Sequence, residues 1–89
     1  MKTPLQLERI IKGVANHRRI EVLQLLAKKP ELSVLEIADE LRLDMKNAAQ
    51  HIQKMAIAGL LMKRHEFNNV RHKLTPRGKS ILEFYRILE

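Results

Sequence analysis

The sequence of 89 residues contains no cysteine and very few aromatic residues. The lack of cysteine excludes disulfides, thiolate metal sites and cysteine nucleophiles together. No apolar run approaches the roughly 20 residues that a membrane-spanning helix needs. The first residues lead directly into an amphipathic segment, whereas a secretory signal would show an unbroken apolar stretch there. We therefore expect a cytoplasmic protein that has no membrane partner.

The composition that remains is typical of one small domain, and we assign residues 1–89 to it. Hydrophobic residues make up 45% of the chain and charged residues 30%, which excludes a disordered tail. A chain of this length has room for one core but little room for a substrate pocket. An enzyme is therefore the least expected class.

Basic residues outnumber acidic ones, and the excess lies in the second half of the chain. Lys and Arg total 17 against 10 Asp and Glu, for a net charge of +7. Residues 1–44 hold eight basic and seven acidic residues, whereas residues 45–89 hold nine basic and three acidic. A basic half beside a nearly neutral half suggests a face that binds a polyanion. A merely well-solvated surface is the alternative that composition leaves open.

Helix-capping residues divide the first 59 residues into four predicted helices. Thr3 with Gln6 and Ser33 with Glu36 have the spacing of capping boxes. Behind each cap, apolar residues recur every three or four positions, which is typical of a helix with one buried face. The predicted helices follow the caps Thr3, Asn16, Ser33 and Asp44, the second ending near Pro30 and the fourth at Gly59. Because only two or three residues separate the third helix from the fourth, these two helices should cross steeply, as in a helix-turn-helix.

After Gly59 the pattern changes to two strand-like runs, 61–67 and 70–74, around Asn68 and Asn69. Asparagine tolerates a positive φ, so the Asn pair suits the two-residue turn of a hairpin. That turn would pair Phe67 with Val70, His65 with His72 and Lys63 with Leu74, leaving Arg64, Glu66, Arg71 and Lys73 on the other face. Thr75 and Pro76 then begin a last helix. The predicted fold is mainly α with a small β-hairpin: a winged helix-turn-helix of five helices and a two-stranded wing.

The fourth predicted helix has one apolar side and one polar side. At 100° per residue, the apolar side holds Met45, Ala48, Ala49, Ile52, Met55 and Ala56. The opposite side holds Lys46, Asn47, Gln50 and Lys54, which are residue types that read base edges or bind phosphates. His51 lies on the flank, where it can donate to a phosphate or to a neighbouring carbonyl. An ordinary polar surface is the alternative, but the helix-turn-helix spacing favours DNA binding.

The predicted wing carries three basic residues on one face. Arg64, Arg71 and Lys73 would contact the DNA backbone or enter a minor groove. A solvated edge ribbon, which basic residues protect from aggregation, is the alternative. His65 and His72, if they lie opposite each other, supply only two ligands, so we expect no zinc site there.

Several runs resemble the ArsR-type winged-helix repressors. They are the Asn16–Leu23 run, the Glu31–Ala38 run, Gln50-His51-Ile52 and Ala58-Gly59-Leu60-Leu61. The run from Leu74 to Lys79 is more similar to the MarR group and to small archaeal winged helices. The resemblance implies a homodimeric transcription regulator that places its fourth helix in the major groove.

The chain departs from the ArsR pattern at both of that family's metal sites. ArsR metal sensors carry a Cys-Val-Cys run where this chain has Ser33-Val34-Leu35, which cannot bind a soft metal. The other inherited site uses Asp, His and Glu on the last helix, and residues 75–89 contain neither His nor Asp. A small polar residue usual before Gln50 is Ala49 here. We therefore expect no metal and no other cofactor.

The terminal helices carry more apolar residues than one buried stripe requires. This surplus predicts a two-fold interface between two copies of the chain. The alternative is that the same residues cover the core of a monomer. The residues that we assign to the dimer interface are Leu7, Ile11, Phe84, Tyr85, Ile87 and Leu88.

The function that the sequence predicts is a transcriptional regulator that binds double-stranded DNA sequence-specifically as a homodimer, with repression as the expected effect. One alternative is an architectural protein that coats DNA with little sequence preference. Another is a winged-helix module that binds a protein and not DNA. No nucleophile, base and acid occur together in a pattern that would support an enzyme.

Overall fold

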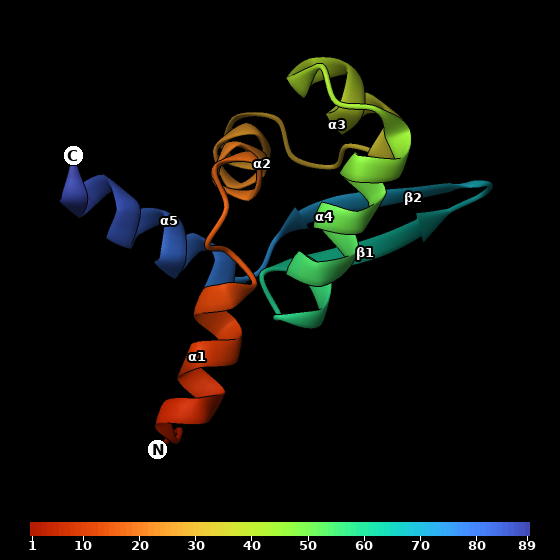
Figure 1. Ribbon diagram of the computed structural model, residues 1–89. Coiled ribbons are helices and arrows are strands. Elements are labelled where there is room, and N and C mark those ends of the chain that lie inside the picture. The colour runs from red at the N-terminus through yellow and green to blue at the C-terminus, as the bar shows by residue number, and fades with distance from the viewer.

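The computed structural model describes all 89 residues as five helices and one antiparallel hairpin. The elements are α1 (Pro4–Lys12), α2 (His17–Lys28), α3 (Val34–Leu41), α4 (Met45–Ile57), β1 (Leu61–Glu66), β2 (Asn69–Leu74) and α5 (Pro76–Leu88) (Figure 1). The predicted winged helix-turn-helix is confirmed. None of the helices combines the length and the apolar character needed to cross a membrane.

The helices begin at the residues that the capping signals indicate. The hydroxyl of Thr3 accepts from the Gln6 backbone N–H at 3.2 Å, and the Gln6 side chain accepts from the Thr3 N–H at 2.8 Å. Ser33 and Glu36 form the same reciprocal pair at the start of α3. Each box satisfies two N–H groups that have no partner inside the helix, so local chemistry alone sets these boundaries.

The core lies among α2, α3, α4, the base of the wing and one side of α5. Its buried hydrophobic side chains include Leu23, Ile37, Ile52, Met55 and Leu60, each at most 2% exposed. Helix α1 contributes no buried residue. Figure 1 shows α1 and the end of α5 projecting away from the other elements. The terminal helices therefore leave apolar side chains uncovered in one copy of the chain.

The hairpin has a different register from the one that the Asn pair predicts. Glu66 pairs with Asn69, so the turn is Phe67–Asn68, and Phe67 takes the positive φ of 54°. The predicted turn at Asn68 and Asn69 is therefore wrong, and each residue of β2 pairs with the residue two positions earlier in β1 than predicted. The shift puts His72 opposite Lys63 rather than His65, but it leaves every side chain on the predicted face because the shift is an even number.

Contacts at the base of the wing explain this register. His72 is 1% exposed, and its backbone pairs with Leu32 on the edge away from β1. Its N–H donates to the Leu32 carbonyl at 2.9 Å, and its carbonyl accepts from the Glu31 N–H at 2.9 Å. Burial of the Leu61–Leu74 pair and this third strand-like segment fix β2 in place. With β2 fixed in this register, the turn falls at Phe67 and Asn68, and Phe67 adopts a positive φ.

Candidate nucleic-acid interface

The polar side of α4 is exposed along its whole length. Lys46, Asn47, Gln50 and Lys54 are all exposed, while Ala48, Ile52 and Met55 are buried. The helix therefore turns its polar face outward, as the sequence predicts. Met45 and Ala49, which the sequence places on the apolar side, are not buried, because both are exposed in the first turns of α4.

Gln53 also belongs to this exposed face, although it is absent from the residues predicted from the sequence. It is exposed, and it lies three residues after Gln50 and seven after Lys46, so the three side chains share one side of the helix. We call Lys46, Asn47, Gln50, Gln53 and Lys54 the reading face. No acidic residue occurs anywhere in α4, so the face carries amides and positive charge only.

Asp44 orients the first amide of the reading face. One of its carboxylate oxygens caps α4 by accepting from the Asn47 N–H, and the other accepts from the Asn47 side-chain amide, both at 2.8 Å. The amide uses one of its two N–H groups in this contact, and its carbonyl oxygen has none. Asn47 thus keeps one donor and one acceptor, the pair that binds an adenine edge.

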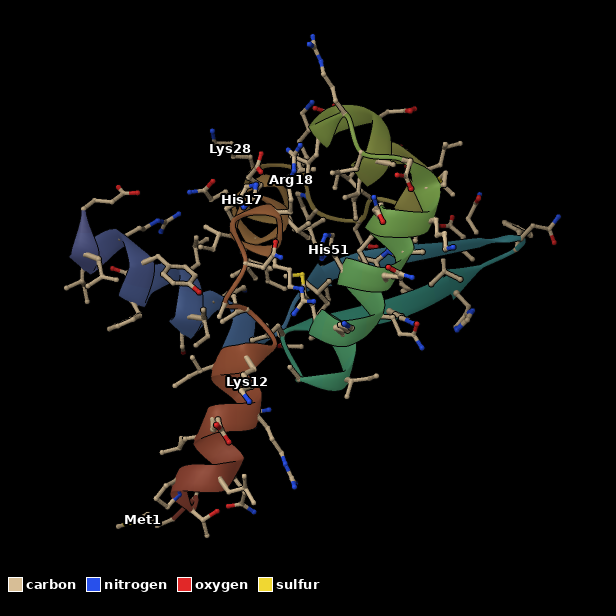
Figure 2. All side chains as sticks on the ribbon, viewed as in Figure 1. Met1, Lys12, His17, Arg18, Lys28 and His51 are labelled. Atoms are coloured by element: carbon tan, nitrogen blue, oxygen red, sulfur yellow. The ribbon has the colours of Figure 1, made fainter.

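His51 connects α4 with the start of α2. Its Nδ1 accepts a hydrogen bond from Nε of Arg19 at 3.2 Å, which leaves the ring proton on Nε2. Burial lowers the pKa of His51, and the charges of Arg19 and Lys54 lower it further. His51 is therefore a neutral donor on the flank of the reading face. Figure 2 shows it facing the start of α2, where His17 and Arg18 lie.

Arg64 and Arg71, two of the three basic residues on the predicted contact face of the wing, are held by carboxylates. Arg64 pairs with Glu31 at 3.0 Å and with Glu66 at 3.1 Å, and Arg71 pairs with Glu66 at 3.1 Å and with Glu36 at 3.5 Å. Arg71 also donates to the Glu31 carbonyl at 3.0 Å. We call these five residues the wing network. Its arginines are engaged in ion pairs with carboxylates of the same chain, whereas the sequence predicts that they contact DNA.

The contacts of the wing network shift the pKa values of several of its members. The hydrogen bond from Arg71 lowers the pKa of Glu66, and Arg64 lowers it further. The pKa of Arg64 is raised, chiefly by its hydrogen bond with Glu31. The pKa of Glu36 is lowered mainly by hydrogen bonds from Ser33 and also by the charge of Arg71. The network thus keeps its members charged and ties β1 and β2 to the start of α3.

Two other wing cations lie outside the network. Lys73 is exposed and forms no ion pair with a carboxylate, so of the three predicted wing contacts it is the one with a free charge. Lys63 is also exposed and lies on the face shared with Leu61 and His72, the side of the hairpin that packs against the helices. Lys63 is absent from the predicted contacts because the sequence pattern places the functional face of the wing on the opposite side.

The histidines of the wing lie apart from any cluster of metal ligands. His72 forms a contact of 2.9 Å between Nδ1 and the Leu32 carbonyl oxygen, and His65 pairs with Val70 instead of His72. The sequence prediction that the two histidines lie opposite each other is therefore wrong. No three side chains of His, Asp or Glu lie close enough together to hold a metal ion.

The terminal helices expose the apolar residues that the sequence assigns to a dimer interface, with one exception. Tyr85 is half-buried, and its hydroxyl donates to the Val14 carbonyl at 3.2 Å. Burial raises the pKa of this hydroxyl. Tyr85 therefore joins α5 to the connection between α1 and α2 within one copy of the chain. The exposed members are Leu7, Ile11, Phe84, Ile87 and Leu88.

The chain matches known proteins in both sequence family and fold. The family described as a helix-turn-helix domain matches residues 14–64. A comparison with curated protein sequences finds no match. One similar solved structure comes from Mycobacterium bovis. It is the homodimeric winged helix-turn-helix DNA-binding domain of a possible ArsR-family transcriptional regulator. The two sequences are 25% identical, the match covers 93% of this chain and 77% of that one, and the TM-score is 0.83.

Two further structures have the same architecture. HlyU from Vibrio cholerae is 29% identical, with 94% of this chain and 91% of that one covered and a TM-score of 0.81. NolR from Sinorhizobium fredii is 19% identical, with coverage of 99% and 94% and a TM-score of 0.85, which shows the fold alone. Fold and family are thus those of transcription regulators and not of enzymes. The chain belongs to the helix-turn-helix domain family, and its winged fold is the one shared by ArsR-type regulators, as the sequence resemblance implies.

Proposed function

We propose that this protein is a sequence-specific transcriptional regulator that binds double-stranded DNA and acts as a repressor. The observation that carries the proposal is the reading face of α4: exposed amides and lysines, with no acid, on the second helix of a helix-turn-helix. Gln50 and Gln53 lie near its centre, where a helix in the major groove meets base edges. The cytoplasmic location expected from the sequence stays a prediction.

The proposal divides the expected DNA contacts into base readers and phosphate readers. Asn47, Gln50 and Gln53 supply the amides that select bases, while Lys46, Lys54 and the Nε2–H of His51 contact the backbone beside them. In the wing, Lys73 and Lys63 provide the free charge. Arg64 and Arg71 reach phosphates only by leaving the carboxylates of the wing network. Their part in binding is therefore smaller than the sequence alone suggests.

The proposal includes a homodimer that is formed by α1 and α5. Exposed side chains on these helices include Ile11 at 57%, Phe84 at 54% and Leu88 at 66%. Burying such residues between two copies removes apolar surface from water at about 25 cal/mol per Å². The homodimeric description of the Mycobacterium bovis domain supports this arrangement. Two recognition helices would then meet an inverted repeat, with half-sites about one helical turn apart.

Selection of bound duplexes from a random DNA pool tests the function. A sharply enriched inverted repeat is the expected result, and duplexes that bind but share no sequence would instead identify an architectural coating protein. A pool with no bound duplex would contradict the proposal and favour a winged-helix module that binds a protein.

Substitution of the exposed faces of α5 tests the dimer. Phe84→Asp combined with Leu88→Asp should produce monomers in sedimentation experiments and weaken binding to the two-half-site duplex strongly, because each half-site then binds independently. Arg86→Asp, which makes a charge change of the same sign on the side of α5 away from Phe84 and Leu88, should leave the dimer intact. A wild type that sediments as a monomer at tens of micromolar, a range in which stable dimers are associated, would contradict this part of the proposal.

A further inference from the structure

A second cationic region lies beside the reading face, where the ends of several helices meet. Five basic residues line a hollow of about 440 Å³, and no acidic residue lines it. They come from four different helices: Arg9 and Lys12 from α1, Arg19 from α2, Lys54 from α4 and Arg77 from α5. We call this hollow the cationic groove. The sequence pattern does not reveal it, because its members are spread over nearly seventy positions.

Two glycines allow the helix ends to approach closely enough to form the groove. A Cβ atom on Gly13 would lie 2.5 Å from the Cβ of Ala58, so the end of α1 packs directly on the end of α4. Gly59 has a φ of 79°, and the guanidinium of Arg77 lies over it, where a Cβ would come within 2.6 Å. Gly13 requires glycine because the Cβ of Ala58 has no flexible end that could move away, whereas Gly59 is favoured by its positive φ, since the end of the Arg77 side chain could move.

Two of the five cations are fixed by hydrogen bonds to backbone carbonyls at these helix ends. Arg19 donates to the carbonyls of Lys12 and Gly13 at 3.1 and 3.3 Å, and Arg77 donates to the carbonyl of Ala58 at 2.8 Å. These bonds satisfy carbonyls that have no partner inside α1 and α4. They also hold two positive charges in place without neutralising them, because the acceptors are carbonyls and not carboxylates.

The remaining three cations are exposed, and their charge is almost uncompensated. Arg9 and Lys54 form no ion pair, and Lys12 contacts only Glu8 of its own helix, at 3.5 Å, with both side chains largely exposed. The positive field of this region reaches His51. Burial is the main cause that lowers the pKa of His51, and the charges of Arg19 and Lys54 lower it further. Like charges gathered in a concave site repel each other unless an anion occupies it.

The position of the groove indicates which anion that is. The groove adjoins the last turn of α4 through Lys54, and Figure 1 shows α1 and the tip of the wing on opposite sides of α4. If α1 forms the two-fold interface, the groove lies on the side of the recognition helix that faces the dimer axis. In a bound inverted repeat, that side faces the DNA backbone between the two half-sites.

We propose that the cationic groove is a second phosphate-binding site, which holds backbone phosphates of the DNA between the two half-sites. The proposal rests on the proposed function and adds phosphate contacts from α1, α2 and α5, with Lys54 as the one residue that the groove shares with the reading face. Arg9 and Lys12 are its exposed phosphate ligands, and Arg19 and Arg77 are the charges that backbone carbonyls hold in place. Binding here adds affinity without base specificity, because every sequence offers the same phosphates.

The test combines Arg9→Gln with Lys12→Gln. Both side chains point away from the Leu7–Ile11 stripe of α1, so the dimer should persist, as sedimentation checks. The logarithmic salt slope of DNA binding should flatten by about 0.9 for each phosphate that the variant no longer binds, equally on specific and scrambled duplexes. The matched control is Lys28→Gln with Lys29→Gln. These residues lie at the other end of α2, about 16 Å along the helix from its start, and their substitution should leave the slope unchanged.

Neutral methylphosphonate linkages locate the contact on the DNA. Placed between the half-sites of the selected duplex, they should weaken the wild type but leave the Arg9→Gln, Lys12→Gln variant unaffected. Linkages placed outside the half-sites should weaken both proteins equally. The proposal is overturned if the double variant keeps the wild-type salt slope while binding the duplex normally.

A titration without DNA separates the backbone from a free phosphorylated molecule. Inorganic pyrophosphate, followed by ³¹P NMR, should bind the wild type only weakly. Saturable pyrophosphate binding that the double variant loses, together with an unchanged salt slope on DNA, would overturn the proposal in favour of a small phosphorylated ligand. If the wild type binds no DNA at all, the proposed function itself fails, and that result is distinct from a failure of the groove alone.

Discussion

The reading face and the wing network are both rich in basic residues, but the basic residues of the reading face are unpaired and those of the wing network form ion pairs. On α4, Lys46 and Lys54 have no acidic neighbour within their helix and form no ion pair. On the wing, Arg64 and Arg71 each contact two carboxylates. Counting basic residues along the sequence makes the two regions look alike, whereas the fold leaves one charged and neutralises the other.

The difference teaches that free charge depends on tertiary contacts. Glu31 and Glu36 lie more than thirty positions before the arginines that they bind, and the bridge between Leu32 and His72 brings them to the wing. The wing network therefore stabilises the attachment of the wing, while the reading face remains available to a ligand. We expect substitutions in the two regions to affect different measurements.

The largest expected effect is the removal of the Gln50 amide from the reading face. Gln50→Ala should cost roughly 1–3 kcal/mol on the preferred duplex, because the variant cannot form the bidentate hydrogen bonds of an amide with a base. Binding to scrambled DNA should change little, so the preference for the selected sequence becomes weaker. Titrations on both duplexes measure this difference.

Gln24→Ala provides the matched control for that substitution. Gln24 is an exposed glutamine of α2, away from the reading face, and its substitution should leave both affinities unchanged. The assignment of base reading to α4 is contradicted if Gln50→Ala lowers both affinities equally while a wing variant changes the sequence preference.

The salt dependence of binding separates the free cations from the paired ones. Lys46→Gln and Lys73→Gln should each flatten the logarithmic salt slope by about 0.9 for every phosphate contact removed. Arg64→Gln should leave the slope nearly unchanged, because its guanidinium is already occupied by Glu31 and Glu66. Binding titrations at several salt concentrations give the slopes. A slope that flattens as much for Arg64→Gln as for Lys46→Gln would show that the wing network opens on DNA.

Acidification should destabilise the folded chain through two histidines whose pKa values burial lowers, His72 at the base of the wing and His51 on the flank of the reading face. Burial lowers the pKa of His72 from its usual value of about 6.5, and the charge of Lys63 lowers it further, although the Leu32 carbonyl opposes this. The unfolded chain therefore binds more protons than the folded chain as pH falls below about 6.5, and acidification favours unfolding. The urea midpoint should be lower at pH 5.5 than at pH 8.

Two measurements assign that pH dependence. The NMR signal of the His72 ring should titrate at a lower pH than that of a free histidine. His65→Gln, which removes an exposed histidine of the same face, should keep the full decrease in the urea midpoint. A midpoint that stays constant between pH 8 and pH 5.5 would contradict the contribution of His72. Below that range, protonation of Glu66, whose pKa is also lowered, removes further stability by the same sign argument.

Much of the fold could be predicted from the sequence because local chemistry determines it. The capping boxes at Thr3 and Ser33 use partners three residues away, and the amphipathic pattern of α4 requires only the helical period. The hairpin register was predicted wrongly, because His72 and Leu32 fix it through a contact over forty positions. The exposure of Met45 and Ala49 also could not be predicted, because the helical period gives the apolar side but not which of its residues the rest of the chain covers.

Some residues of the candidate site could likewise be predicted from local sequence patterns, and others could not. Gln50 and Lys46 could be assigned from the helical period, and Gln53 could have been found from the same spacing. The carboxylate partners of Arg64 and Arg71 could not be predicted, because no sequence spacing relates them. The cationic groove requires four helix ends to meet, and the sequence offers only Gly13 and Gly59 as local hints of close approach.

The smallest expected effect is a gain. Glu66 is the carboxylate that Arg64 and Arg71 share, so Glu66→Gln should release part of the positive charge of the wing. We expect DNA affinity at low salt to rise by about two- to threefold on every sequence, since exposed ion pairs are individually weak and phosphate contacts carry no base preference. Glu83→Gln is the matched control: it adds the same net charge on α5, where Glu83 pairs only with Arg86. Filter-binding titrations at two salt concentrations compare the variants. If both raise the affinity equally, net charge explains the gain. If only Glu66→Gln does so, and its advantage disappears at high salt, the wing network restrains DNA binding through the two arginines that it holds.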